Sequence, residues 1–297
     1  MILENTVPLV IIFLIGYFFK KIKILKSKDS KVFSKLLMYV VIPAVIIDSF
    51  SRATIDASLI YLPISGLLVV ITLTILGFLF AHVLKLDKIK KGAFVTTFPT
   101  LEGGTLGYAF MLSVFGAEGL SRLILFDISN AFYLFTVVYF ISGRFGGNNT
   151  KITDALMDLI KTPLIWAMVV GLFLNFIGFQ NVVVSNIFDM IGRSLLFLVM
   201  LMLGLEFHPE IKYFKLPMLE IFLKTACGFG IGVLLSSFFG FTELERATVI
   251  IGASLPPSFI TLIFAKENGL DTKYVANLIS IALPIGMLFM FLILGYL

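Results

Sequence analysis

A carboxylate stands in the middle of a long apolar segment of this sequence. Glu102 follows Pro99 and precedes Gly103 and Gly104, all within residues 92–115. A carboxylate at the centre of a bilayer costs roughly 2.5–3.5 kcal/mol even on a lenient insertion scale, so it should face the protein interior and have a partner or a function. Burial would favour its protonated form, whereas a nearby helix N-terminus would favour its charged form. Glu102 could therefore carry a proton, serve as a charged ligand, or cap its own broken helix.

A second apolar segment, residues 246–265, is interrupted in the same way by Ser254, Pro256, Pro257 and Ser258. In hydrocarbon, broken backbone is tolerated only where protein buries it or where it lines a polar cavity. One break alone is equally well explained as a packed kink, but two matched breaks favour a binding site. Each break would expose unpaired N–H groups and the positive end of a half-helix, which together attract anions, carboxylates in particular.

The residue types at the two breaks fit this interpretation. Pro256 and Pro257 suit a helix start, where a missing N–H costs nothing, and Ser254 could accept a hydrogen bond from an unpaired backbone donor. Gly103 and Gly104 allow the backbone to leave helical dihedral angles and allow a ligand to approach closely. We therefore expect the two breaks to converge on one site near the middle of the membrane.

Further polar residues lie within apolar segments. Asp127 and Asn130 are about one helical turn apart and share a face, so they could line the same cavity. Asp127 is equally consistent with a hydrated position at the membrane interface. The remaining charged residues are expected to form pairs along one helix or to lie at the interface: Arg193 with Asp189, Glu220 with Lys224 near the cytoplasmic surface, and Asp48 at the outer interface.

The composition identifies an integral membrane protein. Hydrophobic residues make up 59% and charged residues 14% of the 297 residues, and the mean hydropathy is +1.05, whereas soluble domains have about 45–50% and about 25%. The single cysteine, Cys227, excludes an internal disulfide and a thiolate metal cluster, and neither histidine lies in a His-Glu-x-x-His motif. We expect no cofactor, no metal site and no enzyme. The net charge of +5 comes from lysines in short loops, which fits membrane topology and not a nucleic-acid partner.

Ten segments approach the roughly 20 apolar residues that a membrane-spanning helix needs: residues 6–19, 32–50, 60–84, 92–115, 120–142, 162–178, 185–206, 217–239, 246–265 and 273–296. If the loops alternate sides, most basic loop residues fall on one side, and Arg52, Arg122 and Arg246 fall on the other. This asymmetry places the basic loops in the cytoplasm and both termini outside the cell. We expect a multi-pass protein of the cell membrane, with Val7–Phe19 as a true first span and not a cleaved signal peptide.

The two halves of the chain resemble each other. Aligning them pairs apolar segments that share a Pro-Leu-x6-Gly-x-Phe pattern: Pro8 with Pro163, Gly16 with Gly171, and Phe18 with Phe173. A repeat of five spans, an odd number, would cross the membrane in the opposite direction in its second copy. The sequence therefore predicts two inverted five-helix repeats, residues 1–142 and 162–297, joined by a cytoplasmic linker at 143–161.

Two motifs carry a resemblance to a known family. Leu101-Glu-Gly-Gly-Thr-Leu-Gly-Tyr108, together with Ser254-Leu-Pro-Pro257 and the downstream Ala265-Lys-Glu-Asn-Gly-Leu-Asp271, resembles the prokaryotic members of the auxin efflux carrier family. The resemblance spans the whole chain. It implies an all-α integral membrane fold of ten helices, like that of bile-acid symporters and sodium–proton antiporters, in which broken helices 4 and 9 cross. Helices 1, 2, 6 and 7 would form a scaffold, and the others a mobile unit.

The resemblance also implies a function. Proteins of this family are secondary transporters of small organic anions, such as malate, malonate or auxin-like acids, and an elevator-type movement of the crossed-helix unit would carry the substrate. The family often has Asn where this chain has Glu102, which favours coupling to H⁺ or Na⁺ through Glu102 and Asp127. Two alternatives remain open, a cation/proton antiporter on the same fold and a membrane sensor without transport. A homodimer through the scaffold helices is also expected. The expected substrate-binding residues are Thr100, Glu102, Gly103, Gly104, Thr105, Asn130, Ser254, Pro256, Pro257 and Ser258.

Overall fold

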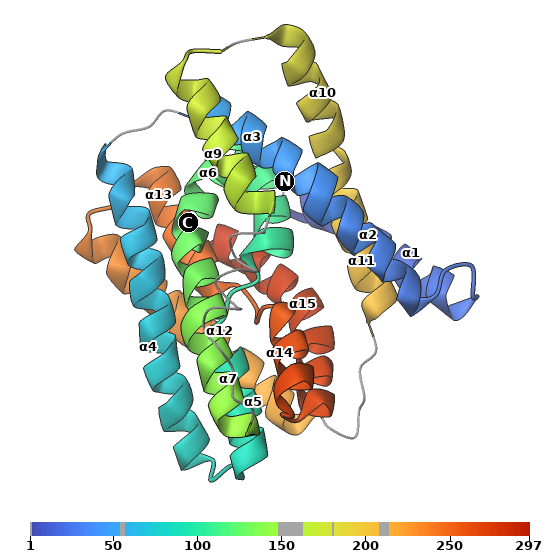
Figure 1. Cartoon of the computed structure of the whole chain (residues 1–297), viewed down its shortest axis with the longest axis vertical. Coiled ribbons are helices and arrows are strands. Elements are labelled where there is room, and N and C mark those ends of the chain that lie inside the picture. The colour runs from blue at the N-terminus through green and yellow to red at the C-terminus, as the bar shows by residue number, and fades with distance from the viewer. Residues whose placement is uncertain (1, 54–56, 148–162, 180, 208–213) are drawn as a thin grey trace. The chain divides into compact units, whose positions relative to one another are not determined.

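The regular structure of the described residues is entirely helical (Figure 1). The computed structural model describes residues 2–53, 57–147, 163–179, 181–207 and 214–297. Within these residues, six helical stretches are long and apolar enough to cross a membrane: Ser27–Arg52, Tyr61–Val83, Gly103–Gly146, Val182–Glu206, Lys215–Phe238 and Thr272–Leu294. The all-α fold is confirmed and is that of an integral membrane protein. The count of ten spans and the inverted repeat stay predictions.

The chain separates into two compact units. Unit 1 contains Met1–Ala57, Gly104–Ile124 and Thr162–Phe207. In this unit α1 packs along α11, and α3 packs against α9 and α10. Gly16 permits the first of these contacts, since an added Cβ would lie 2.3 Å from the Leu201 carbonyl oxygen. The helices of unit 1 are α1 (Ile2–Lys21), α2 (Ser30–Leu36), α3 (Ile42–Arg52), α9 (Pro163–Phe176), α10 (Val182–Gly192) and α11 (Ser194–Glu206).

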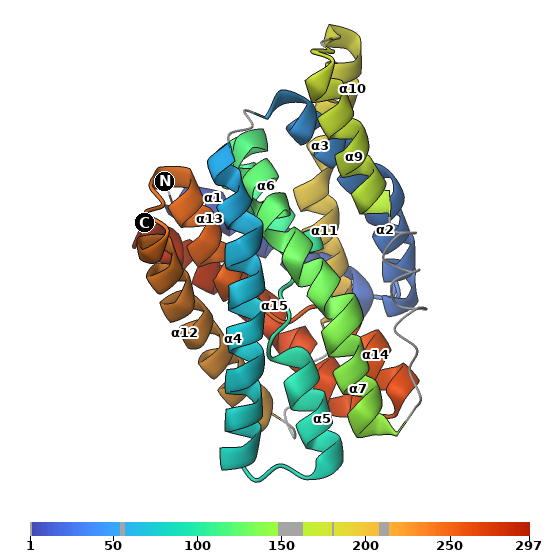
Figure 2. The ribbon, with the colours of Figure 1, turned by 60° about the vertical axis from the view of Figure 1, so that its left-hand side comes forward.

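Unit 2 contains Ser58–Gly103, Leu125–Lys161 and His208–Leu297. In this unit α12 packs against α13, α15 and α4, and α5 lies beside α7 (Figures 1 and 2). Its helices are α4 (Tyr61–Val83), α5 (Lys88–Thr97), α7 (Tyr139–Gly146), α12 (Lys215–Phe238), α13 (Glu243–Ser254), α14 (Ile260–Asn268) and α15 (Thr272–Leu294). One of the points at which the chain passes from one unit to the other falls within α6 (Tyr108–Tyr133), which is kinked at Gly116.

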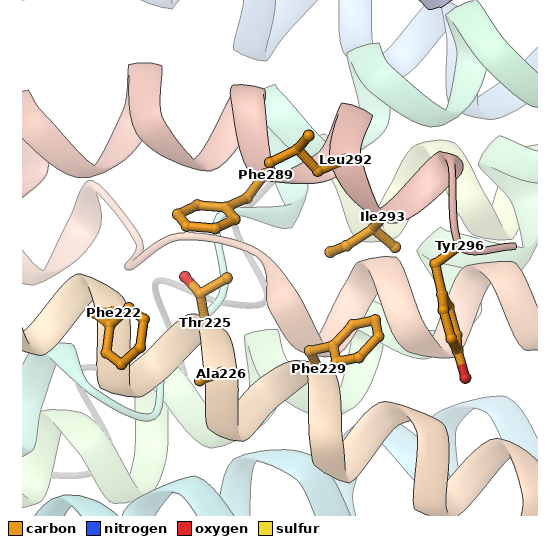
Figure 3. A pocket seen from close by; sticks show the side chains of 8 residues that line it. All are labelled: Phe222, Thr225, Ala226, Phe229, Phe289, Leu292, Ile293 and Tyr296. Carbon is orange, nitrogen blue, oxygen red and sulfur yellow. The ribbon is translucent and has the colours of Figure 1, made fainter.

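The exposed face of α4 is apolar. On α4, large aliphatic side chains such as Ile64, Ile75 and Leu79 are exposed, as expected for a helix that faces lipid. Between α12 and α15 lies a cavity of about 290 Å³. Figure 3 shows that its walls are nearly all apolar, with aromatic rings contributed by both helices: its lining residues are Phe222, Thr225, Ala226, Phe229, Phe289, Leu292, Ile293 and Tyr296.

Both predicted helix breaks are present. Helix α5 ends at Thr97, and helical structure resumes with the π-helical turn Gly103–Gly107. Helix α13 ends at Ser254, and α14 begins at Ile260. The expectation that Pro256 and Pro257 occupy a helix start is wrong, because both lie in the non-helical segment before α14. Their fixed φ angles and missing N–H groups keep this segment extended.

The predicted division into residues 1–142, 143–161 and 162–297 stays a prediction. Helix α7 continues through Gly146, so the first residues of the predicted linker are helical. The rest of that linker, from residue 148, lies outside the described residues. The two compact units are interleaved along the chain, because each takes segments from both predicted repeats.

Candidate functional site

The two breaks meet inside unit 2 through backbone hydrogen bonds. The Glu102 N–H donates to the Pro256 carbonyl oxygen at 2.8 Å. The Ser258 N–H donates to the hydroxyl oxygen of Thr100 at 3.1 Å. Since buried backbone groups need partners, each broken segment supplies hydrogen bonds that its own helix no longer provides. The two interruptions therefore form one structural feature, which we call the crossing (residues 98–103 and 254–259).

Glu102 caps a helix at the crossing, but not the helix that precedes or follows it in sequence. Its Oε2 accepts a hydrogen bond of 2.7 Å from the N–H of Phe259, the N-cap residue of α14. The side chain is buried. A carboxylate at this position is stabilised by the positive end of the helix dipole. The position expected to attract an anion is thus occupied by a carboxyl group of the protein itself.

Asn130 and Asp127 support the other side of the crossing. The Asn130 amide accepts from the Leu101 N–H at 3.2 Å and donates to the Leu101 carbonyl at 3.0 Å. It also donates to Oδ1 of Asp127 at 2.8 Å. The Asp127 carboxylate lies against Gly103, where an added Cβ would come within 2.3 Å of it. Asp127 is buried, which disagrees with the hydrated interfacial alternative, and its position beside a cavity stays a prediction.

A buried polar cluster at the C-terminal end of α5 was not predicted. Glu220 and Lys224 on α12 are fully buried. The Lys224 ammonium donates to the Phe98 carbonyl at 3.0 Å, at the C-terminal end of α5. Glu220 accepts from the Thr97 hydroxyl at 2.6 Å and from the Tyr274 hydroxyl. The predicted interaction between Glu220 and Lys224 is present, but the pair is not self-contained, because each side chain also bonds to a neighbouring segment of unit 2. Their position near the cytoplasmic surface stays a prediction.

One feature of the sequence could have indicated this cluster. Two charges of opposite sign lie within an apolar segment predicted to span the membrane, and such residues are usually functional or paired in the interior. The spacing of four residues suggested a pair along the helix. Sequence spacing shows neighbours on one helix, but it cannot show Phe98 and Tyr274, which approach from other helices.

Unit 2 contains most of the residues predicted for the site. Ser254 is buried there, and its hydroxyl donates to the Ile250 carbonyl at 2.7 Å. Since the hydroxyl oxygen can still accept, its expected role as an acceptor at the break stays a prediction. Gly104 and Thr105 belong to unit 1. The predicted site residues in unit 2 are Thr100, Glu102, Gly103, Asn130, Ser254, Pro256, Pro257 and Ser258.

Two predicted charge positions lie in unit 1. The pairing of Arg193 with Asp189 is confirmed, with Nη2 and Oδ2 at 2.8 Å. Asp48 pairs with Arg52 at 2.6 Å between Oδ1 and Nη2. Within the described residues, no cluster of three or more His, Cys, Asp or Glu side chains could hold a metal ion.

The geometry defines a class of protein. Several long apolar helices, with ionisable groups gathered at a buried crossing of two interrupted helices, are typical of membrane carriers. The chain belongs to the family of membrane transport proteins, whose family model matches residues 1–294. This match confirms the resemblance to the auxin efflux carrier family.

The curated relatives extend over nearly the whole chain. The chain is 27% identical over 292 residues to an uncharacterized transporter of Methanocaldococcus jannaschii, covering 94% of this chain and 93% of the relative. It is 23% identical over 284 residues to an uncharacterized transporter of Methanothermobacter thermautotrophicus, covering 93% and 92%. It is 25% identical over 297 residues to uncharacterized transporter YfdV of Escherichia coli K12, covering 91% and 89%.

Proposed function

We propose that this protein is a secondary transporter of small carboxylates across the cell membrane, with Glu102 as the proton-coupling residue. The observation that carries the proposal is the hydrogen bond from the Phe259 N–H to Glu102. The start of α14 offers a backbone donor and a positive dipole end, the features that bind carboxylates in broken-helix carriers. A substrate carboxylate would take the position that the Glu102 side chain fills.

Competition for this position couples substrate to proton. A charged Glu102 holds the N-terminus of α14 and excludes a second carboxylate, since two like charges at one donor repel each other. Protonation of Glu102 weakens its bond to the Phe259 N–H, because a neutral acceptor binds less strongly than a charged one. The substrate anion then binds in its place. One proton therefore accompanies each carboxylate into the site.

Alternating access would follow the family's elevator scheme. In this proposal ten spans form two inverted repeats, helices 1, 2, 6 and 7 form a scaffold that also mediates a homodimer, and the remaining helices carry the site. The two compact units support part of this division, since unit 2 contains the whole crossing, while unit 1 contains residues 104–124 of the predicted mobile helices. Both termini would lie outside the cell, as the distribution of basic residues predicts.

A cation/proton antiporter is the second candidate. The observation that favours it is that each resumed helix is accompanied by a protein carboxylate: Glu102 at the start of α14 and Asp127 beside Gly103. Two buried carboxylates could exchange protons for a cation such as Na⁺ without any organic substrate.

Purified protein in proteoliposomes separates the candidates. We expect uptake of labelled malate that a transmembrane pH gradient accelerates. In the Glu102→Gln variant, acceleration by the gradient should be lost, while malate–malate exchange should persist because the neutral amide, like the protonated carboxyl, can be displaced from the Phe259 N–H by the substrate. Glu267→Gln removes an exposed carboxylate from α14, the helix that Glu102 caps. It is the matched control and should behave like the wild type.

Each other outcome points to a different function. Sodium-driven proton movement in the absence of an organic anion would favour the antiporter. Malate binding without counterflow would favour a membrane sensor that does not transport. Unchanged gradient coupling in Glu102→Gln would remove Glu102 from the proton pathway.

A further inference from the structure

Unit 1 contains a cavity of about 440 Å³ that is separate from the crossing in unit 2. Its walls come from α3, from the α6 residues of unit 1, and from α10 and α11. The lining combines apolar side chains, two hydroxyls and two charged pairs. The apolar side chains include Val45, Leu112, Phe188 and Leu196, the hydroxyls are Ser49 and Ser113, and the charged residues are Asp48, Arg52, Asp189 and Arg193.

The charged residues form two ion pairs on different helices. On α3, the Arg52 Nη2 lies 2.6 Å from the Asp48 Oδ1 and also donates to the Ser185 hydroxyl. At the α10–α11 junction, Nε and Nη2 of Arg193 donate to Oδ2 of Asp189 at 3.1 and 2.8 Å. The second pair is open to its surroundings, since the side chains of Arg193 and Asp189 are 80% and 56% exposed. It can therefore exchange partners with a ligand at low cost.

The four charged side chains in the lining have a net charge of zero, and this balance determines which charges a ligand should carry. A simple anion would bind the guanidinium groups but would add a third negative charge beside Asp48 and Asp189, and a simple cation would meet the opposite difficulty. A molecule with both an ammonium and a carboxylate lets every charge in the cavity keep a neighbour of opposite sign. The apolar side chains in the lining then suit an aliphatic group on the same molecule.

Ser49 supplies independent evidence for a ligand. It lines the cavity and is only 2% exposed, yet its hydroxyl oxygen has no hydrogen-bond partner in the described part of the chain. A buried hydroxyl without a partner is destabilising, so such groups are rare and usually have a purpose. By contrast, Ser51 on the same helix donates to the Asp48 carbonyl at 2.8 Å.

The wall of the cavity is also opened by an interruption of α6. Gly116, one of the lining residues, has a φ of 67° and a ψ of −163°, outside the helical region. Among the described residues, and apart from its own neighbours along the chain, no atom lies within 4 Å of the position that its Cβ would occupy. An aliphatic group can therefore approach the backbone at this point.

We propose that this cavity is a binding site for a zwitterionic α-amino acid with an aliphatic side chain. Its carboxylate interacts with Arg193 and Arg52, its ammonium interacts with Asp189 and Asp48, and the Ser49 hydroxyl completes its hydrogen bonds. The site is distinct from the carboxylate site proposed at the crossing and does not depend on it.

Equilibrium binding of tritiated L-leucine to the purified full-length protein in detergent tests the proposal. We expect saturable binding that unlabelled leucine displaces. Two analogues, each lacking one charge, should compete poorly: 4-methylpentanoate, which has no ammonium, and 3-methylbutylamine, which has no carboxylate. Competition by 4-methylpentanoate as strong as by leucine would overturn the zwitterion assignment, and an absence of saturable leucine binding would overturn the site.

Two serine variants locate the site on α3. Ser49→Ala should weaken leucine binding about tenfold, the loss of one hydrogen bond to a charged group. Its melting temperature should not fall, because the hydroxyl has no partner to lose. Ser51→Ala, the matched control, should leave leucine affinity unchanged. Equal affinities in both variants and the wild type would contradict the proposed role of Ser49.

The exposed ion pair provides a second localisation. Asp189→Asn and Arg193→Gln should each weaken leucine binding by more than about tenfold, because each leaves one charge of the ligand without its partner. Neither variant should be unstable, since the pair is largely exposed. Binding that survives both changes would contradict the proposal. Malate uptake is measured separately, so failure of the leucine site and failure of the proposed transport activity are distinguishable.

Discussion

Gly103 leaves the space that the Asp127 carboxylate fills. An added Cβ would lie 2.3 Å from the Asp127 Cγ and within 2.4 Å of both carboxylate oxygens. Because Asp127 is held by Asn130, which also binds the Leu101 backbone, it cannot retreat without breaking these bonds. We expect Gly103→Ala to abolish malate uptake and to lower stability by about 1–3 kcal/mol, the usual cost of overpacking. Uptake assays and thermal unfolding in detergent measure the two effects.

The neighbouring glycine is the matched control. At Gly104 the nearest atom to an added Cβ is a Leu164 methyl group at 3.9 Å, an ordinary contact. Gly104→Ala should therefore keep nearly all of the stability that Gly103→Ala loses. Equal losses in both variants would show that backbone flexibility, and not the space for Asp127, is what the glycine pair provides.

Lys224 is a buried amine that binds the end of a helix. Its Nζ donates to the Phe98 carbonyl at the negative end of α5 and lies one helical turn from the buried Glu220 side chain. Lys224→Met leaves both uncompensated, so we expect a loss of about 3–5 kcal/mol. The measurement is the free energy of unfolding in a mixed-detergent titration.

A double variant tests whether charge balance is the cause. Glu220→Gln combined with Lys224→Met removes both buried charges, and its stability should be higher than that of Lys224→Met alone. Lys215→Met, at an exposed position at the start of α12, should be close to the wild type. A double variant that is less stable than Lys224→Met would mean that hydrogen bonds, not charge, dominate the cluster.

At the scale of elements, α5 is fixed at both ends. Its C-terminal end is held by Lys224, and its N-cap residue, Asp87, accepts from the Lys90 N–H at 3.0 Å. That backbone hydrogen bond lowers the pKa of Asp87 below its ordinary value of 3.8. A lowered pKa in the folded state means that the cap stabilises the protein above pH 3.8 and that this contribution is lost as the pH falls through the folded-state pKa.

Substitution of the cap should reproduce this dependence. Asp87→Ala should cost about 1 kcal/mol at neutral pH, and the difference from the wild type should shrink in acid as the wild-type carboxylate becomes protonated. Asp87→Asn keeps a side-chain acceptor and should retain most of the neutral-pH stability. Thermal unfolding between neutral pH and pH below 3.8 provides the comparison, and a difference for Asp87→Ala that stays constant with pH would contradict the role of the charge.

The helix breaks were predictable because proline and glycine act locally. Pro99, Gly103, Pro256 and Pro257 restrict or release the backbone whatever surrounds them, and α5 and α13 end within a few residues of the predicted positions. The π-helical turns at Leu37–Val41 and Leu134–Val138 had no such signal. Their sequences are ordinary apolar runs, so packing against other helices decides their geometry.

The partners of the site residues were less predictable, because they depend on tertiary structure. Glu102 was expected to cap its own helix or to bind a ligand, and it caps α14, whose first residue lies far along the chain. Ser254 donates its hydroxyl proton to a carbonyl of its own helix, a bond that sequence reasoning did not predict. Residue type therefore indicated that these positions were special, while the approach of α13 and α14 to α5 determined which bonds form.

At the scale of the whole molecule, the order of the segments along the chain differs from their grouping into compact units. The halves related by the Pro8 and Pro163 pattern are consecutive in the chain, whereas each compact unit combines segments of both halves. An inverted repeat explains this difference, because corresponding helices of the two copies are expected to occupy the same unit. The repeat remains a prediction, and the membrane sidedness that it requires can be measured.

If both termini lie on the outer side of the membrane, the chain must span the membrane an even number of times. In a Cys227→Ala background, single cysteines at Lys28, Lys88 and Thr242, all exposed, report three loops in different parts of the predicted topology. The positive-inside rule places Lys28 and Lys88 in the cytoplasm, and the alternation of loops places Thr242 outside. A membrane-impermeant maleimide should therefore label Thr242→Cys in intact cells, and Lys28→Cys and Lys88→Cys only after lysis. Labelling of Lys88→Cys and Thr242→Cys from the same side would mean that an even number of spans separates them. The predicted number of spans between them is odd, so the inverted repeat could not form.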